Sequence, residues 1–228
     1  MAGQPSAMDR MQERIDQWER ANDPRSVFLS CYALMTRNML DAVGAGEFID
    51  PAWISRLLEH FADYYFNALD AYEAEAERAP EVWRCAHDAA RRSHTPAISL
   101  LLLGVNAHIN YDLVLAVADL LEPEWQALSE ADRRARYDDY CRVNDIIGQT
   151  IDSVQDDILD KREPIMALVD TLFGPADEWL VSRGITHWRE VVWGHAVQRV
   201  ETREAARREV LRQEIEVVAM RWARLFDL

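Results

Sequence analysis

The stretch LLLLGVNAHINYDLVLAVADLL, which runs from Leu100 to Leu121, decides the fold class of this chain. On a helical wheel at about 100° per residue, its apolar side chains face nearly every direction. A helix that is apolar all round must be enclosed by other elements. We therefore expect this segment to form the buried centre of an all-helical domain.

Four polar residues interrupt this apolar stretch. Asn106 and Asn110 are spaced i, i+4 and share one side of the expected helix, whereas His108 and Asp112 share the roughly opposite side. A buried amide without a partner costs about 1–3 kcal/mol, and an unpaired buried carboxylate costs more. These side chains must therefore meet either other groups of the protein or a bound ligand.

Two interpretations of these four residues stay open. Asn106 and Asn110 either tie the central helix to its neighbours or bind a substrate. His108, one turn from Asp112, suits an oriented acid–base pair, two ligands of a divalent metal, or a packing contact. The sequence thus predicts a buried polar cluster, which either holds a small molecule or only fixes the packing of helices.

A second helical segment, WISRLLEHFADYYFNALDAY, offers partners for this cluster. Trp53, His60 and Asn67 recur every seven residues on one face, with Asp63 and Tyr64 beside them. We predict that this face meets the central helix, with Tyr64 and Asn67 in contact with a substrate. The alternative is that Asp63 is solvated and His60 lies at the edge of the core. The expected catalytic residues, which are also the candidate metal ligands, are His60, Asp63, His108 and Asp112.

Two acidic stretches in the second half of the chain resemble parts of a known magnesium site. NDIIGQTID (144–152) is similar to the Asn/Ser/Glu triad of class I terpene cyclases, and DDILD (156–160) is similar to their Asp-Asp-x-x-Asp motif. Those enzymes hold the motifs on facing helices, whereas here both fall on one predicted helix and in reverse order. We therefore expect no diphosphate-binding magnesium cluster. Asn144, beside the apolar stripe of that helix, and Asp145 join the residues expected to bind a substrate.

Charge limits the class of partner. The chain has 40 acidic and 25 basic residues and a formal net charge of -15. Its field repels nucleic acid and the anionic inner leaflet of a membrane. We expect neither as a partner, and we expect a small organic substrate that is uncharged or cationic.

The compartment follows from the cysteines and the N-terminal residues. Cys31, Cys85 and Cys141 are odd in number and form no Cys-x-x-Cys motif, which is typical of free thiols in a reducing compartment. The first twenty residues are charged throughout and lack the apolar core of a signal peptide. The apolar stretch from Ser93 to Tyr111 approaches the length of a membrane span, but its Asn and His residues are costly in hydrocarbon. We expect a cytoplasmic protein.

Helix signals recur along the whole chain, and no segment alternates as a strand does. IDPAW places Asp50 at an N-cap and Pro51 in the first turn, and HTPAI repeats the device with Thr95 and Pro96. No break is long enough for a flexible linker, so residues 1–228 are expected to form one domain. The predicted helices are 6–20, 27–44, 51–77, 81–92, 96–121, 130–161, 164–172, 176–183 and 187–225.

The final segment, from His187 onward, contains ETREAARREVLRQE and mixes Arg with Glu. This composition predicts one long amphipathic helix with a solvated face. We expect it either to flank the bundle or to pair with a second copy of the chain as a homodimer. Trp193, near its start, is a candidate wall of the substrate pocket.

The central helix carries a family resemblance. The string from Leu101 to Leu113, LLLGVNAHINYDL, resembles the largely bacterial family catalogued as domain of unknown function 5995 (DUF5995). The resemblance extends more loosely to HFADYYFNAL before it and DDYCRVNDII after it, and so covers about two thirds of the chain, the first and last helices being least similar. It implies an all-helical single domain with Asn106, His108, Asn110 and Asp112 as its signature, and it implies no particular activity.

The sequence alone leaves two functions. The first is a small-molecule enzyme of hydrolytic, cyclising or lyase type, with or without a divalent metal, in which His108 is the acid–base or a ligand and Asp112 orients it. The second is a non-catalytic helical protein, which binds a ligand or another protein and uses the polar signature only for packing. No complete Glu-x-x-His pair, His-Glu-x-x-His motif or Gly-rich phosphate loop occurs in the chain. The sequence therefore does not decide whether the protein is an enzyme.

Overall fold

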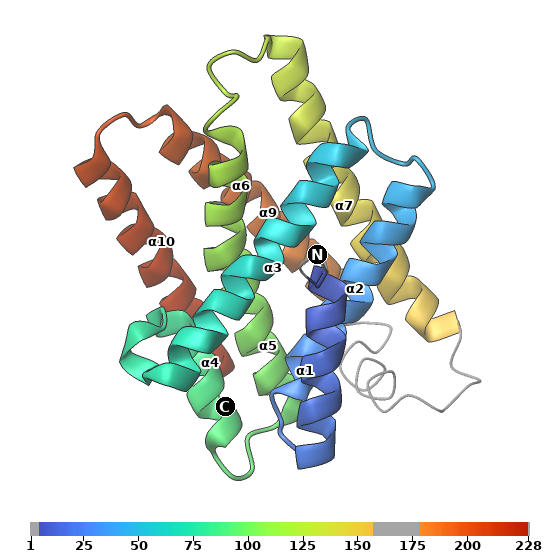
Figure 1. The fold of residues 1–228 in the computed structure, drawn as a ribbon, viewed down its shortest axis with the longest axis vertical. Helices are drawn as coiled ribbons and strands as arrows, with labels where there is room; N and C mark the ends of the chain where they lie inside the picture. Colours follow the sequence, from blue (N-terminus) through green and yellow to red (C-terminus); the bar gives the residue numbers. More distant parts are fainter. Residues whose placement is uncertain (1–4, 157–177, 228) are drawn as a thin grey trace.

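The computed structural model describes residues 5–156 and 178–227, and this part of the chain is helical and contains no strand (Figure 1). The predicted all-α class is confirmed. The helices are α1 (Ala7–Ala21), α2 (Ser26–Gly44), α3 (Pro51–Ala74), α4 (Glu81–Arg91), α5 (Ala97–Ala107), α6 (Leu113–Leu121), α7 (Glu130–Asp156), α9 (Glu178–Glu201) and α10 (Ala205–Phe226). The predicted helix 164–172 and most of the DDILD motif (156–160) lie outside the described residues.

The central helix is enclosed, as its composition predicts. α5 packs against α2, α4 and α10, and α6 packs against α3 and α9, so that the green segment of Figure 1 is surrounded by its neighbours. Ala97–Leu121 is long and apolar enough to cross a membrane, yet most of it is buried inside the fold. The position is that of the core helix of a helical bundle.

A π-turn divides this central helix at its polar signature. Residues His108–Asp112 form the turn between α5 and α6. A π-turn inserts an extra residue into an α-helix, and such insertions are frequent at functional sites. The sequence predicted a continuous helix here, because the apolar pattern on either side keeps helical spacing.

Gly104 lets α2 approach α5 closely. A Cβ atom at this position would lie 2.4 Å from Cγ and 2.8 Å from Cβ of Phe28. Only a residue without a side chain leaves room for Phe28, whose ring contacts Trp83 and His108. The glycine therefore brings α2 into reach of the polar signature.

Two of the predicted helix starts have different outcomes. Asp50 caps α3 as expected, since its carboxylate accepts a hydrogen bond from the backbone N–H of Trp53 at 2.9 Å. The predicted cap at Thr95 is wrong, because its hydroxyl donates to the carbonyl of Ala89 at 2.7 Å and so secures the end of α4.

The single long C-terminal helix is a wrong prediction. α9 continues through the expected break at 182–186, and the chain turns at residues 202–204 before α10 runs back along the bundle (Figure 1). Arg208 and Arg199 secure this turn. The Arg208 guanidinium donates to the carbonyl of Thr202 at 2.6 Å, and Arg199 donates to the carbonyl of Arg208 at 3.1 Å. No Gly or Pro marks the turn in the sequence, so local signals could not reveal it.

Candidate functional site

The π-turn brings His108 and Asp112 into contact in the core. Nδ1 of His108 lies 3.1 Å from Oδ2 of Asp112, and both side chains are buried. The indole N–H of Trp83, on α4, donates to both carboxyl oxygens of Asp112, at 3.0 and 2.9 Å. Asp112 therefore holds one face of the imidazole in place and is itself held by α4.

Aromatic rings enclose the imidazole of His108. The Phe61 ring, from α3, stacks on it with a centroid distance of 3.6 Å and an interplanar angle of 7°. The Tyr32 ring, from α2, meets it edge-on with a centroid distance of 4.1 Å. These contacts fix the orientation of the imidazole.

Burial sets the protonation of this pair. It lowers the pKa of His108 well below the ordinary value and raises the pKa of Asp112 well above its ordinary value, although the hydrogen bond from Trp83 partly opposes the second shift. Both pKa shifts favour the uncharged forms, which gives a neutral imidazole beside a neutral carboxyl group. The Asp112 hydroxyl then donates to Nδ1, and the ring proton of His108 resides on Nε2.

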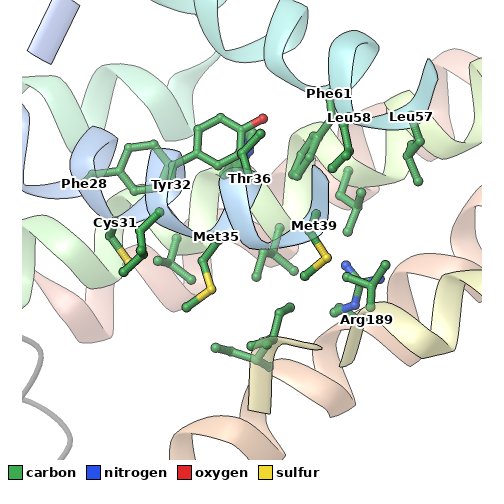
Figure 2. Close-up of a pocket in the computed structure, with 18 of the residues that line it drawn as sticks. Phe28, Cys31, Tyr32, Met35, Thr36, Met39, Leu57, Leu58, Phe61 and Arg189 are labelled. Carbon is green, nitrogen blue, oxygen red and sulfur yellow. The ribbon is translucent and has the colours of Figure 1, made fainter. Parts of the chain in front are cut away.

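That second nitrogen has no partner. Nε2 of His108 is buried and makes no hydrogen bond to a described residue. His108 lines a cavity of about 150 Å³, bounded by side chains from α2, α3, α5, the π-turn, α7 and α9. An unpartnered polar atom in a protein interior is expensive and calls for an unseen partner. The apolar lining of this cavity (Figure 2) includes Met35, Met39, Leu57, Val105, Ile109 and Ile147.

Two hydroxyl groups from α2 join the cavity wall. The hydroxyls of Tyr32 and Thr36 are buried and close enough to interact with each other, although neither makes a hydrogen bond of good geometry to a described residue. Burial and the nearby Asp112 raise the pKa of Tyr32, so its hydroxyl stays protonated and able to donate. Together with Nε2 of His108, the residues that line the cavity thus carry three buried polar atoms that a ligand or water could satisfy.

Arg189, from α9, stands at the other end of the cavity (Figure 2). Its Nε donates to Oδ1 of Asn144 at 2.5 Å, and its Nη2 donates to the carbonyl of Tyr140 at 2.8 Å. The guanidinium lies over the Tyr140 ring, 4.2 Å from its centroid. These contacts from α7 hold a buried cation against the cavity.

Cys31 also lines the cavity, but it is a poor nucleophile. Burial raises the pKa of its thiol to about 11. Because the thiolate is the reactive form, the thiol is inert near neutral pH.

The two asparagines of the signature bind protein groups. Nδ2 of Asn106 donates to the carbonyl of Ala219 in α10 at 2.9 Å, and Nδ2 of Asn110 donates to Oδ1 of Asn106 at 2.9 Å. They lie on the opposite side of the central helix from His108 and do not line its cavity. Their geometry is that of a link between α5 and α10, so the expected role in binding a substrate gains no support.

The predicted contact of His60 and Asp63 with His108 is corrected by the structure. Nε2 of His60 lies 3.1 Å from Oδ2 of Asp119, and Asp63 pairs with Arg10 of α1 at 2.7 Å. The register of α3 instead turns Phe61 toward the imidazole, because the apolar ring suits the buried side. The His60 side chain is 35% exposed, which puts it at the edge of the core.

The other candidates on α3 also lie elsewhere. Tyr64 donates its hydroxyl to Asp119 at 2.6 Å, and Asn67 is exposed. The described residues contain no group of three or more His, Cys, Asp or Glu side chains that could hold a metal ion. The predicted four-residue metal site is therefore not assembled.

The predicted substrate-binding residues from the second half of the chain have different outcomes. Asn144 contributes indirectly, through Arg189, whereas Asp145 is exposed and pairs with Arg142 at 3.0 Å. Trp193 does not line the cavity; its ring packs on Tyr140, with a centroid distance of 5.0 Å. Its predicted role as a pocket wall gains no support from this cavity.

Sequence reasoning missed the aromatic residues that contact His108 and Asp112, and it missed Arg189. Tyr32, Phe61 and Trp83 read as ordinary core aromatics, and no local spacing linked them to the signature. For Arg189, the sequence contained one indication of a special role. It occupies the same stripe of α9 as the buried Val192 and Ala196, where an arginine is unusual.

The comparisons with known proteins give a family and nothing further. The model of the family of unknown function DUF5995 matches residues 5–227, including the terminal helices that seemed least similar. The chain belongs to this family. No curated protein and no solved structure matches it.

Proposed function

We propose that this protein is a small-molecule enzyme that binds a largely apolar substrate in the cavity and uses His108 for acid–base chemistry. The observation that carries the proposal is that Nε2 of His108, a residue that lines the cavity, is buried and has no partner among the described residues, while the other ring nitrogen meets Asp112. A purely structural role would account for the hydrogen bond between His108 and Asp112. It would not account for a buried Nε2 that has no partner among the described residues.

The neutral pair suits transfer of a proton to the substrate. Nε2–H of His108 would donate its proton to an oxygen of the bound molecule, while the hydroxyl of Asp112 passes its proton to Nδ1. The imidazole thus stays neutral, and the negative charge moves to Asp112, where the Trp83 N–H stabilises it. The hydroxyls of Tyr32 and Thr36 would hold the same substrate oxygen or one beside it.

The lining supports cyclising or lyase-type chemistry more than hydrolysis. A buried water needs two to four polar partners, and most of this cavity is hydrocarbon. No Asp or Glu among the described residues lines the cavity to activate a water molecule. Cys31, as a protonated thiol, offers no covalent route.

A pair of probes tests the binding half of this proposal. Benzene fits cavities of about 150 Å³, and phenol adds only a hydroxyl group that can meet Nε2. Wild-type protein should bind both, and His108→Phe should retain benzene while its affinity for phenol falls about tenfold. Benzene binding thereby shows that the variant keeps its cavity. Equal loss or equal retention of the two probes by the variant would contradict a polar role for His108.

Turnover tests the catalytic half. Purified protein is incubated with a small-molecule extract of the source cells, and mass spectrometry follows each compound with time. Wild-type protein should consume at least one compound that His108→Phe and a cavity-filling variant, Val105→Phe, leave unchanged. If wild-type protein binds probes but consumes nothing that the variants spare, the enzyme proposal fails.

The second candidate is a non-catalytic binding protein. It is favoured by the asparagines, whose described hydrogen bonds all go to protein groups. The same cavity would then hold a ligand without changing it. The turnover experiment separates this candidate from the first.

The remaining expectations on partners and compartment are proposals on weaker grounds. Net charge argues against nucleic acid and membranes, and three free cysteines argue for the cytoplasm. The expected homodimer would use α10, on which Val217 and Leu225 are exposed. Sedimentation of the wild-type chain beside Val217→Glu tests it.

A further inference from the structure

The guanidinium of Arg189 is a buried cation without a carboxylate partner in the described part of the chain. The residue is only 4% exposed, and its described hydrogen bonds go to an amide oxygen and a carbonyl. The remaining nitrogen, Nη1, makes no hydrogen bond to a described residue, but it is not among the fully buried polar atoms that lack a partner. A buried charge needs a partner of opposite sign to offset its loss of hydration.

Neighbouring arginines show how readily this acidic chain supplies such partners. Both arginines lie on α7, which packs against α9. Arg142 contacts both Glu47 and Asp145, and Arg136 contacts both Asp50 and Glu124. The chain has 40 acidic residues, yet the described structure brings none of them to Arg189. Among the described residues, Arg189 therefore differs from these two arginines in lacking an acidic partner.

The cavity reinforces the positive charge. No Asp or Glu lines it among the described residues, and burial raises the pKa of Asp112, behind His108, and so disfavours its charged form. In an apolar enclosure, the field of one cation is weakly screened. The local charge is thus opposite to the net charge of the protein, from which we expected an uncharged or cationic substrate.

We propose that the molecule held in this cavity is a small organic carboxylate, with its carboxylate on Arg189 and its reacting oxygen near His108. This inference rests on the proposed function and names the substrate class of the same cavity. A volume of about 150 Å³ limits the apolar part to roughly the size of benzene, or about six carbon atoms. Arg189 offers Nη1 to the carboxylate, and Asn144 and Tyr140 orient the guanidinium by occupying its other nitrogens.

Three ligands of one chain length test the preference. Hexanoate, 1-hexanol and hexylamine are titrated into the wild-type protein by calorimetry at pH 7.5. Hexanoate should bind at least tenfold more tightly than hexanol, and hexylamine should not bind. Hexanol binding as tightly as hexanoate would overturn the inference.

Variants assign the preference to Arg189. Arg189→Met keeps an unbranched apolar side chain and should bind hexanol as before while losing the tenfold advantage of hexanoate. Asn144→Asp supplies an internal carboxylate beside Nε and should weaken hexanoate binding without unfolding the protein. Arg142→Met, at the surface, is the matched control and should keep the preference. An unchanged preference in both Arg189→Met and Asn144→Asp would overturn the assignment.

Failure of the two proposals can be told apart. If benzene and hexanol bind but hexanoate has no advantage, the carboxylate inference is wrong and the cavity stands as a ligand site. If none of the probes binds, the proposed function is wrong as well.

Discussion

Substitution of Asp112 tests whether Asp112 and His108 share a proton in a hydrogen bond or are only packed against each other. In Asp112→Ala, the Trp83 N–H and Nδ1 of His108 both lose their described partner. Each orphaned group costs about 1–3 kcal/mol, so the variant should lose about 2–6 kcal/mol of unfolding free energy. That is a large part of a typical total of about 5–15 kcal/mol.

Asp112→Asn should be far milder. The amide oxygen accepts the Trp83 N–H, and the amide N–H donates to Nδ1 of His108 in place of the carboxyl hydroxyl. Every hydrogen bond of the neutral pair is kept, so the cost should be within about 1 kcal/mol. Urea unfolding at pH 7, followed by tryptophan fluorescence, measures both variants.

The pH dependence gives an independent reading of the same pair. The folded state raises the pKa of Asp112, so its stabilising effect is complete at low pH and is lost as pH rises through the folded pKa. The lowered pKa of His108 opposes this trend below about pH 6.5. Because His108 is present in both proteins, its contribution cancels in a comparison, and the wild type should lose about 1.4 kcal/mol per pH unit relative to Asp112→Asn from about pH 4 upward, until Asp112 ionises.

Three outcomes would refute this reasoning. The two variants could cost the same, or the stabilities of the wild type and Asp112→Asn could change in parallel from about pH 4 upward. Nitrogen NMR could also show that the ring proton of wild-type His108 is on Nδ1 and not on Nε2, which would mean that Asp112 accepts this hydrogen bond as an ionised carboxylate.

Three further substitutions probe the core. Tyr32→Phe removes a hydroxyl without a described partner and should leave the unfolding free energy unchanged or raised. Tyr140→Phe removes a hydrogen bond of 2.8 Å and should lower the unfolding free energy by about 1 kcal/mol. The reverse order of the two variants in urea unfolding would contradict the assigned contacts. Gly104→Ala forces Phe28 away from α5 and should cost about 1–3 kcal/mol despite the better helix propensity of alanine, so a melting temperature at or above the wild-type value would count against the close contact. Burial lowers the pKa of His87 to about 3, so the wild type should gain about 1.4 kcal/mol per unit from about pH 3 to 6.5 relative to His87→Phe, and parallel acid-denaturation curves would show that His87 is not held neutral.

The sequence by itself determined the features that depend on neighbours within one helix. The apolar run from Leu100 to Leu121 identified the core helix, because only enclosure by other helices can bury a surface that faces all directions. The i, i+4 spacings placed His108 against Asp112 and Asn106 against Asn110, and both contacts are present. Helical periodicity carries such contacts over one turn.

The tertiary structure alone decided which distant side chains meet the signature. His60 and Asp63 share a helix with Phe61, and packing of α3 against the core selected the apolar ring. Arg189 reaches the cavity from a helix whose start the sequence misplaced. Helical spacing specifies the faces of each helix but not the rotation and crossing at which helices pack, because these depend on the fit of side chains from every helix at once.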